Sequence, residues 1–296
     1  MRSTATRRKQ LDPSQTGRHA LILERGLRRL VVGQDESIDQ IVNVYQTYLA
    51  GMSSPTRPVG NFLFLGPTGT GKTRVVEATA QTLAGDPLAA VKIDCAEFQH
   101  SHEIAKLIGS PPGYLGHRET HPLLSQETLD QHRSPRCEIS FVLFDEIEKA
   151  SDALWNLLLG ILDKAALTLG DNRRVDFSKT MIFMTSNLGA SEMDAMMRPG
   201  LGFGVHAKIN ADEARGSEQI SQRLKSAGVS AARRKFTPEF INRLDKIVVF
   251  NTLGDEQLRK ILDLELRHVQ ERVFAGTPFL FRLTGRKISC WAKAPM

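Results

Sequence analysis

The stretch that decides the fold reads Gly66-Pro67-Thr68-Gly69-Thr70-Gly71-Lys72-Thr73. It follows an apolar run at residues 62–65 and leads into a helical pattern over residues 73–83. In a strand–loop–helix of this form, glycines let backbone amides surround phosphate oxygens, and the helix adds the positive end of its dipole. We therefore predict a nucleotide site in which Lys72 reaches the β- and γ-phosphates and the Thr73 hydroxyl completes a Mg²⁺ shell. The alternative is an ordinary glycine-rich turn.

Composition and charge exclude several classes of protein. The chain has 296 residues, of which 41% are hydrophobic, so it can bury a large core. No apolar run approaches the roughly 20 residues that cross a bilayer, so we expect no membrane partner. The net charge of +6 comes mostly from basic residues near the two ends. Without a basic face between them, we expect no nucleic-acid partner.

The three cysteines lie far apart in the sequence and lack the spacing of metal ligands. They are Cys95, Cys137 and Cys290. We expect reduced thiols in a cytoplasmic protein.

Apolar runs and helical patterns alternate along the chain. The expected strands are residues 61–65, 90–94, 139–144, 181–185 and 247–250, and the helices between them are residues 73–83, 102–107, 153–162 and 217–225. Continuous apolar runs indicate strands that are buried on both faces, and their alternation with helices predicts a parallel sheet. The fold class is therefore α/β, with a parallel five-stranded sheet flanked by helices.

Three segments complete this organisation. We expect a basic disordered tail at residues 1–25, a large nucleotide-binding domain at residues 26–250 and a partial, helical small domain at residues 251–296. Helices are expected at residues 21–30 and 36–50, and an amphipathic helix at residues 255–273 opens the small domain. Residues 168–177 predict a hairpin that turns at Gly170-Asp171-Asn172.

Polar residues follow two of the predicted strands. Asp145 and Glu146 end the strand at residues 141–144, and Asn187 follows the next strand along. Metal-assisted phosphoryl transfer needs an acid near Mg²⁺ and a base that orients the attacking water. We assign Asp145 to the metal and Glu146 to the base, with Asn187 holding the water or the γ-phosphate. Taken alone, an Asp-Glu pair at a strand end is commonplace, and an Asn there can simply favour a turn.

Five segments together resemble the second, C-terminal ATPase module of the Clp family of AAA+ protein unfoldases. They are residues 66–73, 107–116, 145–150, 185–189 and 236–243, which read GPTGTGKT, LIGSPPGYLG, DEIEKA, TSNLG and FTPEFINR. The similarity covers roughly residues 27–273. It implies an AAA+ fold, the cofactors ATP and Mg²⁺, and an ATPase that assembles into a ring, expected to be a hexamer. Such a ring threads unfolded or tagged protein substrates through its pore.

The resemblance also implies roles for individual residues. Val31 and Val32 match the segment that touches adenine in that family. Arg243 resembles the arginine finger that reaches the γ-phosphate of the neighbouring subunit, where it would stabilise charge in the transition state. Without the resemblance, an ordinary salt bridge with Asp245 would be the better interpretation of Arg243.

Two loops match segments that contact other proteins in the family. Gly113-Tyr114-Leu115-Gly116 resembles the pore loop that grips substrate, and the hairpin at residues 168–177 stands where the family has a second pore loop. Leu201-Gly202-Phe203 resembles the tripeptide with which some members dock on a ClpP-type peptidase. The alternatives are that Tyr114 and Phe203 fold back onto the domain.

The sequence departs from the family after residue 273. No Gly-Ala-Arg triplet follows, Gly285-Arg286 is a poor substitute, and we expect the small domain to be truncated. Two rival functions therefore stay open. One is an AAA+ nucleic-acid motor or loader, which the Gly-Tyr-Leu-Gly segment argues against, and the other is a nucleotide-binding scaffold that does not hydrolyse ATP.

Overall fold

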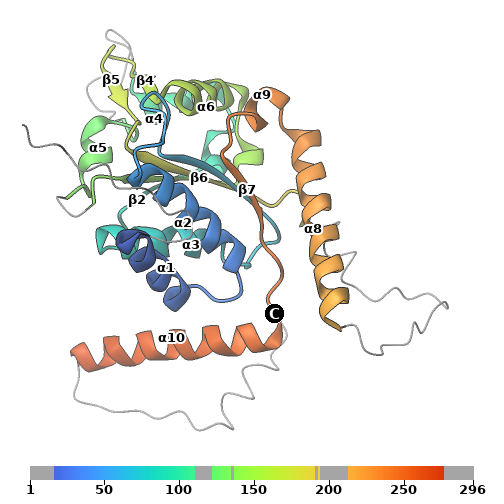
Figure 1. Cartoon of the computed structure of the whole chain (residues 1–296). Coiled ribbons are helices and arrows are strands. Elements are labelled where there is room, and N and C mark those ends of the chain that lie inside the picture. Colours follow the sequence, from blue (N-terminus) through green and yellow to red (C-terminus); the bar gives the residue numbers. More distant parts are fainter. Residues whose placement is uncertain (1–16, 111–121, 135–136, 191–192, 194–212, 277–296) are drawn as a thin grey trace, which may run out of the picture.

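The computed structural model describes residues 17–110, 122–134, 137–190, 193 and 213–276. At its centre lies a five-stranded sheet in the order β2-β3-β6-β1-β7, in which every neighbouring pair is parallel (Figure 1). Its strands are β1 Gly60–Leu65, β2 Ala90–Asp94, β3 Ser140–Asp145, β6 Thr180–Ser186 and β7 Lys246–Val249. The predicted α/β class with a parallel five-stranded sheet is thus confirmed.

Helices precede, separate and follow the strands. They are α1 Arg18–Leu30, α2 Asp35–Leu49, α3 Lys72–Ala84, α4 Ala105–Ile108, α5 Gln126–Asp130, α6 Asp152–Lys164, α8 Glu213–Lys235, α9 Pro238–Ile241 and α10 Asp255–Gly276. Three 3₁₀ turns are η1 Cys95–Phe98, η2 Ser101–Ile104 and η3 Ile147–Lys149. Within the described ranges, no helix is both long and apolar enough to cross a bilayer.

The sheet is covered on both faces because its strands alternate between two cores. In β1, Leu63 and Leu65 pack with α6 and α8, whereas Phe62 and Phe64 pack with α1, α2 and α3. These four side chains are fully buried. Burial on both faces explains why the strands appear in the sequence as continuous apolar runs.

Several predicted boundaries change in the structure. Helix α1 begins at Arg18, so the last part of the expected tail is helical. The helix expected at residues 102–107 divides into η2 and α4. Helix α8 extends well beyond the predicted residues 217–225 and passes through Gly228. A Cβ on Gly228 would lie 2.6 Å from Cε of Met193 and 3.1 Å from Cγ2 of Val249, so close packing of the helix offsets the low helix propensity of glycine.

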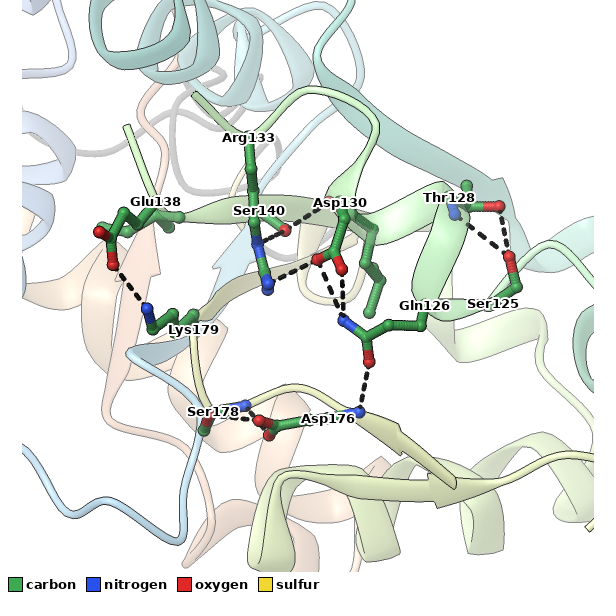
Figure 2. Close-up of polar contacts among 12 residues, drawn as sticks. Ser125, Gln126, Thr128, Asp130, Arg133, Glu138, Ser140, Asp176, Ser178 and Lys179 are labelled. Atoms are coloured by element: carbon green, nitrogen blue, oxygen red, sulfur yellow. Dashed lines mark hydrogen bonds and ion pairs between the residues drawn. The ribbon is translucent and has the colours of Figure 1, made fainter. Parts of the chain in front are cut away.

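The predicted hairpin is confirmed as β4 Ala166–Thr168 paired antiparallel with β5 Arg174–Asp176. Figure 2 shows how α5 joins this hairpin to the start of β3. Gln126 accepts a hydrogen bond from the amide of Asp176 at 2.9 Å and donates to Asp130 at 3.0 Å. Arg133 then pairs with Asp130 at 2.5 Å and donates to Oγ of Ser140 at 2.7 Å. The hairpin is therefore anchored to the amino end of β3, the strand that ends in Asp145.

Candidate active site

The phosphate loop connects β1 to α3 and depends on its glycines. Gly66 has φ 143°, and a Cβ there would lie 2.6 Å from the carbonyl oxygen of Phe250. Gly71 has φ 93° and caps α3, and a Cβ there would meet no atom within 4 Å. Backbone conformation therefore requires glycine at both positions, and close packing requires it at Gly66 as well. The open side at Gly71 leaves the loop accessible at the positive end of α3.

Lys72 is the most enclosed cation of this region, with 8% of its surface exposed. Its Nζ donates to the carbonyls of Gly66 at 2.6 Å and Pro67 at 2.9 Å, and to Oδ1 of Asn187 at 2.9 Å. Burial lowers the pKa of Lys72, and three nearby carboxylates oppose that effect: Asp145, Glu148 and Glu146. The predicted phosphate-binding lysine therefore lies within the electrostatic reach of the predicted catalytic acids.

Asp145 and Glu146 are positioned by a hydroxyl from the neighbouring strand. The Oγ1 of Thr185 donates to Oδ1 of Asp145 and accepts a 3.1 Å hydrogen bond from the amide of Glu146. Glu146 has φ 54°, an uncommon conformation for a residue other than glycine, which turns the chain sharply away from β3. Sequence reasoning named Thr185 only as part of a strand end.

Both carboxylate oxygens of Glu146 have partners. Oε1 accepts a hydrogen bond from Nδ2 of Asn187 at 3.2 Å, and Oε2 lies 2.5 Å from Nζ of Lys149. Hydrogen bonds therefore join Lys72, at the start of α3, through Asn187, which follows β6, to Glu146, which follows β3. The sequence assigned each of them to one site, and the structure brings them together.

Glu148 is a site residue that sequence reasoning missed. Its Oε1 accepts a hydrogen bond from the amide of Asn187 at 3.1 Å, and its Oε2 is buried without a hydrogen-bond partner among the described residues. Glu148 lies in the short turn η3, where no periodic pattern indicates which side chain points inward. Its proximity to Asn187 follows only from the pairing of β3 with β6.

The residues present fit a Mg²⁺ ion held together with a nucleotide. Where the chain is described, no three or more His, Cys, Asp or Glu side chains form a metal cluster by themselves. Magnesium in nucleotide sites usually takes only one or two carboxylates, along with waters and phosphate oxygens. Asp145 at the end of β3 and Thr73 in the first turn of α3 provide a donor set of that hard, oxygen-only kind.

The predicted adenine segment borders a pocket of about 160 Å³ beside the phosphate loop. Its lining comes from three parts of the chain: Val31, Val32 and Gln34; Gly69, Thr70 and Gly71; and Leu253, Ile261, Leu264 and His268. The last group belongs to α10 and to the segment that leads into it. Helix α10 therefore lines one side of the pocket beside the phosphate loop, a role that was not predicted for it from the sequence.

Arg243 precedes β7 and lies near the amino ends of the strands, opposite to the carboxyl ends where the phosphate loop lies. Its carbonyl accepts a hydrogen bond from Nδ2 of Asn61 at 3.1 Å, near the start of β1, whereas the phosphate loop follows the end of β1. The guanidinium pairs with Glu239 at 2.9 Å and lies 3.6 Å from Asp163. The predicted alternative, an ordinary salt bridge, is wrong in its partner. Arg243 pairs with Glu239 and Asp163, whereas the Asp245 carboxylate accepts the amide hydrogen of Asn61 and lies 3.9 Å from Arg57.

Two predicted segments lie outside the described residues. These are Gly113-Tyr114-Leu115-Gly116 and Leu201-Gly202-Phe203. The hairpin that was expected to be a second pore loop is described, and its turn carries Asp171 and Arg173, which pair with each other at 2.7 Å.

Comparison with known proteins agrees with this geometry. A family model described as AAA domain (Cdc48 subfamily) matches residues 57–247. Heat shock protein 100 of Trypanosoma brucei brucei is 41% identical over 88% of this chain and 27% of its own length. The chaperone protein ClpB2, chloroplastic, of Oryza sativa subsp. japonica is 38% identical over 86% of this chain and 24% of its own length. The chain thus spans about a quarter of the length of these curated relatives.

Solved structures give the same result. A closed-state cryo-EM reconstruction of Hsp104 with ATPyS and FITC casein aligns with a TM-score of 0.70 and 32% identity, covering 86% of this chain and 39% of that chain. An extended S. cerevisiae Hsp104:casein complex aligns with a TM-score of 0.69 and 30% identity, over 87% of this chain and 40% of that chain. The chain therefore belongs to the family of AAA domains of the Cdc48 subfamily, and its relatives there include Hsp100, ClpB and ClpC proteins.

Proposed function

We propose that this chain is a Mg²⁺-dependent ATPase module that assembles into a ring, expected to be a hexamer, and uses ATP hydrolysis to thread polypeptide through the pore. The observation that carries the proposal is the chain of contacts from Lys72 through Asn187 to Glu146. It joins a phosphate-binding lysine to a carboxylate that can accept a proton from water. Hsp104, a similar protein, is described with ATPyS and casein, which supports both the nucleotide and the polypeptide substrate.

In the proposed reaction, water attacks the γ-phosphorus of ATP and the bond to the β-phosphate oxygen breaks. Glu146 takes a proton from the attacking water, and Asn187 orients that water. Lys72 and the loop amides offset the negative charge that develops on the phosphate oxygens. A magnesium ion, held through Thr73 and Asp145, would further neutralise the phosphates.

Before this reaction the site must exchange some of its present contacts. Lys72 bonds to two loop carbonyls and to Asn187, so a phosphate oxygen would compete with these acceptors for its three N–H groups. The carboxylate of Glu146 has about four lone-pair sites, so it can accept a hydrogen bond from water beside those from Lys149 and Asn187 or in place of one of them. The Lys149 pair is the easier one to break, because its two side chains are 46% and 32% exposed.

Arg243 is proposed to act in the site of the neighbouring subunit. Its position at the amino edge of the sheet supports this role, because the phosphate loop of the same chain lies at the opposite edge. Tyr114 is proposed to contact the threaded polypeptide. Leu201-Gly202-Phe203 is proposed to dock on a ClpP-type peptidase, and the similarity to ClpC, described as an ATP-binding subunit of a Clp protease, supports that partner.

The decisive experiment measures nucleotide binding, phosphate release and particle size on the same preparation. We expect Mg-ATP to bind, phosphate to be released and the particle to grow beyond a monomer. Lys72→Ala should abolish binding, whereas the control Lys92→Ala, which removes only an exposed pair with Glu77, should behave as the parent protein. No binding of Mg-ATP at millimolar concentration would refute the proposal. Binding by a persistent monomer without phosphate release would favour the scaffold instead.

A further inference from the structure

Gln34 is a buried polar residue for which the reaction described above has no role. Only 6% of its surface is exposed. Its Nε2 donates to the carbonyl oxygen of Thr70 at 3.0 Å and to that of Asn251 at 2.9 Å. A side-chain amide has two N–H donors, so these bonds use both of them. The two acceptors lie 36 and 217 residues away in the sequence.

The first acceptor belongs to the phosphate loop. Thr70 also donates from Oγ1 to the carbonyl of Pro67 at 2.9 Å, which closes the loop on itself. The Thr70 carbonyl belongs to the peptide unit whose N–H is that of Gly71, the residue that caps α3. Gln34 therefore sets the orientation of a peptide unit next to the amides that would face a phosphate.

The second acceptor belongs to the connection between the sheet and α10. Asn251 follows Phe250, whose amide bonds to the carbonyl of Leu65 at 2.7 Å, so this connection begins beside the strand that leads into the phosphate loop. The Oδ1 of Asn251 is buried with no hydrogen-bond partner among the described residues. The hydrogen bond from Gln34 to the Asn251 carbonyl therefore matters, because the side-chain oxygen of the same residue already lacks a partner and a second unsatisfied buried acceptor would be costly.

Close packing joins the same two segments. Gly33, next to Gln34, has φ 77°, and a Cβ there would lie 2.9 Å from Cγ of Gln257 and 3.2 Å from Cδ2 of Leu253. The start of α10 and the residues before it thus pack closely against the turn that carries Gln34. Further along, Ile261 and Leu264 of α10 line the pocket beside the phosphate loop.

We infer that Gln34 is a positioning residue that couples occupation of the phosphate loop to the placement of α10. A nucleotide that holds the Thr70 peptide in its bonded orientation also holds Gln34, and Gln34 holds the connection to α10 at Asn251. By linkage, docking of α10 strengthens nucleotide binding by the same factor with which the nucleotide strengthens docking. The inference rests on nucleotide binding as proposed above, and it does not require hydrolysis. The simpler alternative is a glutamine that only satisfies two buried carbonyls.

Two substitutions separate these alternatives. Gln34→Glu keeps the shape of the side chain but places a carboxylate oxygen against two carbonyl oxygens. Gln34→Met removes both donors without adding a charge, and it serves if the glutamate variant does not fold. The matched control is Gln46→Glu, which makes the same chemical change at a half-buried position within α2, the helix that Gln34 caps, and away from the phosphate loop.

The experiment is hydrogen–deuterium exchange of the full chain with and without a non-hydrolysable ATP analogue, together with the dissociation constant of that analogue. In the parent chain and in Gln46→Glu, the analogue should protect both residues 66–72 and residues 255–268. In Gln34→Glu at saturating analogue, residues 66–72 should remain protected while the added protection of residues 255–268 is lost. The dissociation constant of the analogue should rise by the factor with which docking of α10 strengthens nucleotide binding. For couplings of this kind that factor is about 5- to 150-fold.

Three outcomes would overturn the inference. The first is protection of residues 255–268 in both Gln34 variants as in the parent. The second is a parent chain in which the analogue protects residues 66–72 but not residues 255–268. The third is loss of protection of residues 255–268 in the variants with an unchanged dissociation constant. Failure of the proposed function looks different. In that case the analogue protects neither segment in the parent chain, because it does not bind.

Discussion

The side-chain amide of Asn187 donates a 3.2 Å hydrogen bond to the carboxylate of Glu146. At its other end the same amide accepts a hydrogen bond from Lys72 at 2.9 Å. One neutral side chain thus connects the residue proposed to sense the phosphate with the residue proposed to activate water. Loss of the proton acceptor should therefore be separable from loss of nucleotide binding.

Glu146→Gln should bind ATP with nearly the affinity of the parent and release phosphate about 10²- to 10⁴-fold more slowly. The amide keeps the shape of the side chain and can still accept from Asn187, but it cannot take a proton from water. Calorimetric binding and steady-state phosphate release measure the two effects. Glu97→Gln is the control, because Glu97 is an exposed acid in the turn η1. Turnover near the parent rate in Glu146→Gln would remove Glu146 from the role of base.

Arg243→Ala should be inactive alone and should recover activity when it is mixed with Glu146→Gln. In a mixed ring, a site with an intact Glu146 can face an intact Arg243 from the neighbouring subunit. We expect phosphate release from the mixture to exceed that of either variant, measured across mixing ratios after reassembly. If Arg243 serves the site of its own chain, no mixing ratio restores activity.

Ser140→Ala should lower the free energy of unfolding by about 1–3 kcal/mol. The Ser140 hydroxyl is buried, donates to the carbonyl of Leu129 at 2.6 Å and accepts from Arg133 at 2.7 Å (Figure 2). Ser178→Ala is the control, because its hydroxyl makes an exposed contact with Asp176 and should contribute less. Urea unfolding of the two variants compares them directly, and equal effects would contradict the importance of this link between α5 and β3.

Cys95 and Cys137 should resist thiol reagents in the folded protein at pH 8. Burial raises the pKa of both thiols, so the reactive thiolate is scarce and enclosed. In a Cys290→Ser variant, a chromogenic thiol reagent should react with no thiol of the folded protein. After denaturation it should react with both remaining thiols. The unfolded thiols ionise near pH 8.5, below the pKa of the folded ones, so stability should fall as pH rises above that value. Rapid reaction of the folded variant would contradict the burial of these thiols.

Local sequence patterns predict three features of this protein: the glycines of the phosphate loop, the buried strands, and the polar residues at the ends of those strands. Phe62 and Phe64 belong to one core and Leu63 and Leu65 to the other, so a continuous apolar run of this kind indicates a strand that is covered on both faces. The carboxyl ends of parallel strands meet at one edge, which is why Asp145 and Asn187 could be assigned to the phosphate loop in advance.

Other features depend on contacts between segments that are remote in sequence. The sequence by itself determined the strand–loop–helix at Lys72 and the chemistry available there, because short-range periodicity and glycine content carry that information. Only the tertiary structure decided that Glu148 supports Asn187, that Arg243 lies at the far edge from its own phosphate loop, and that Gln34 joins this loop to the start of α10. The reason is physical: most buried polar groups form a hydrogen bond, and the partner is selected by which strands pair and which segments pack, not by the neighbours along the chain.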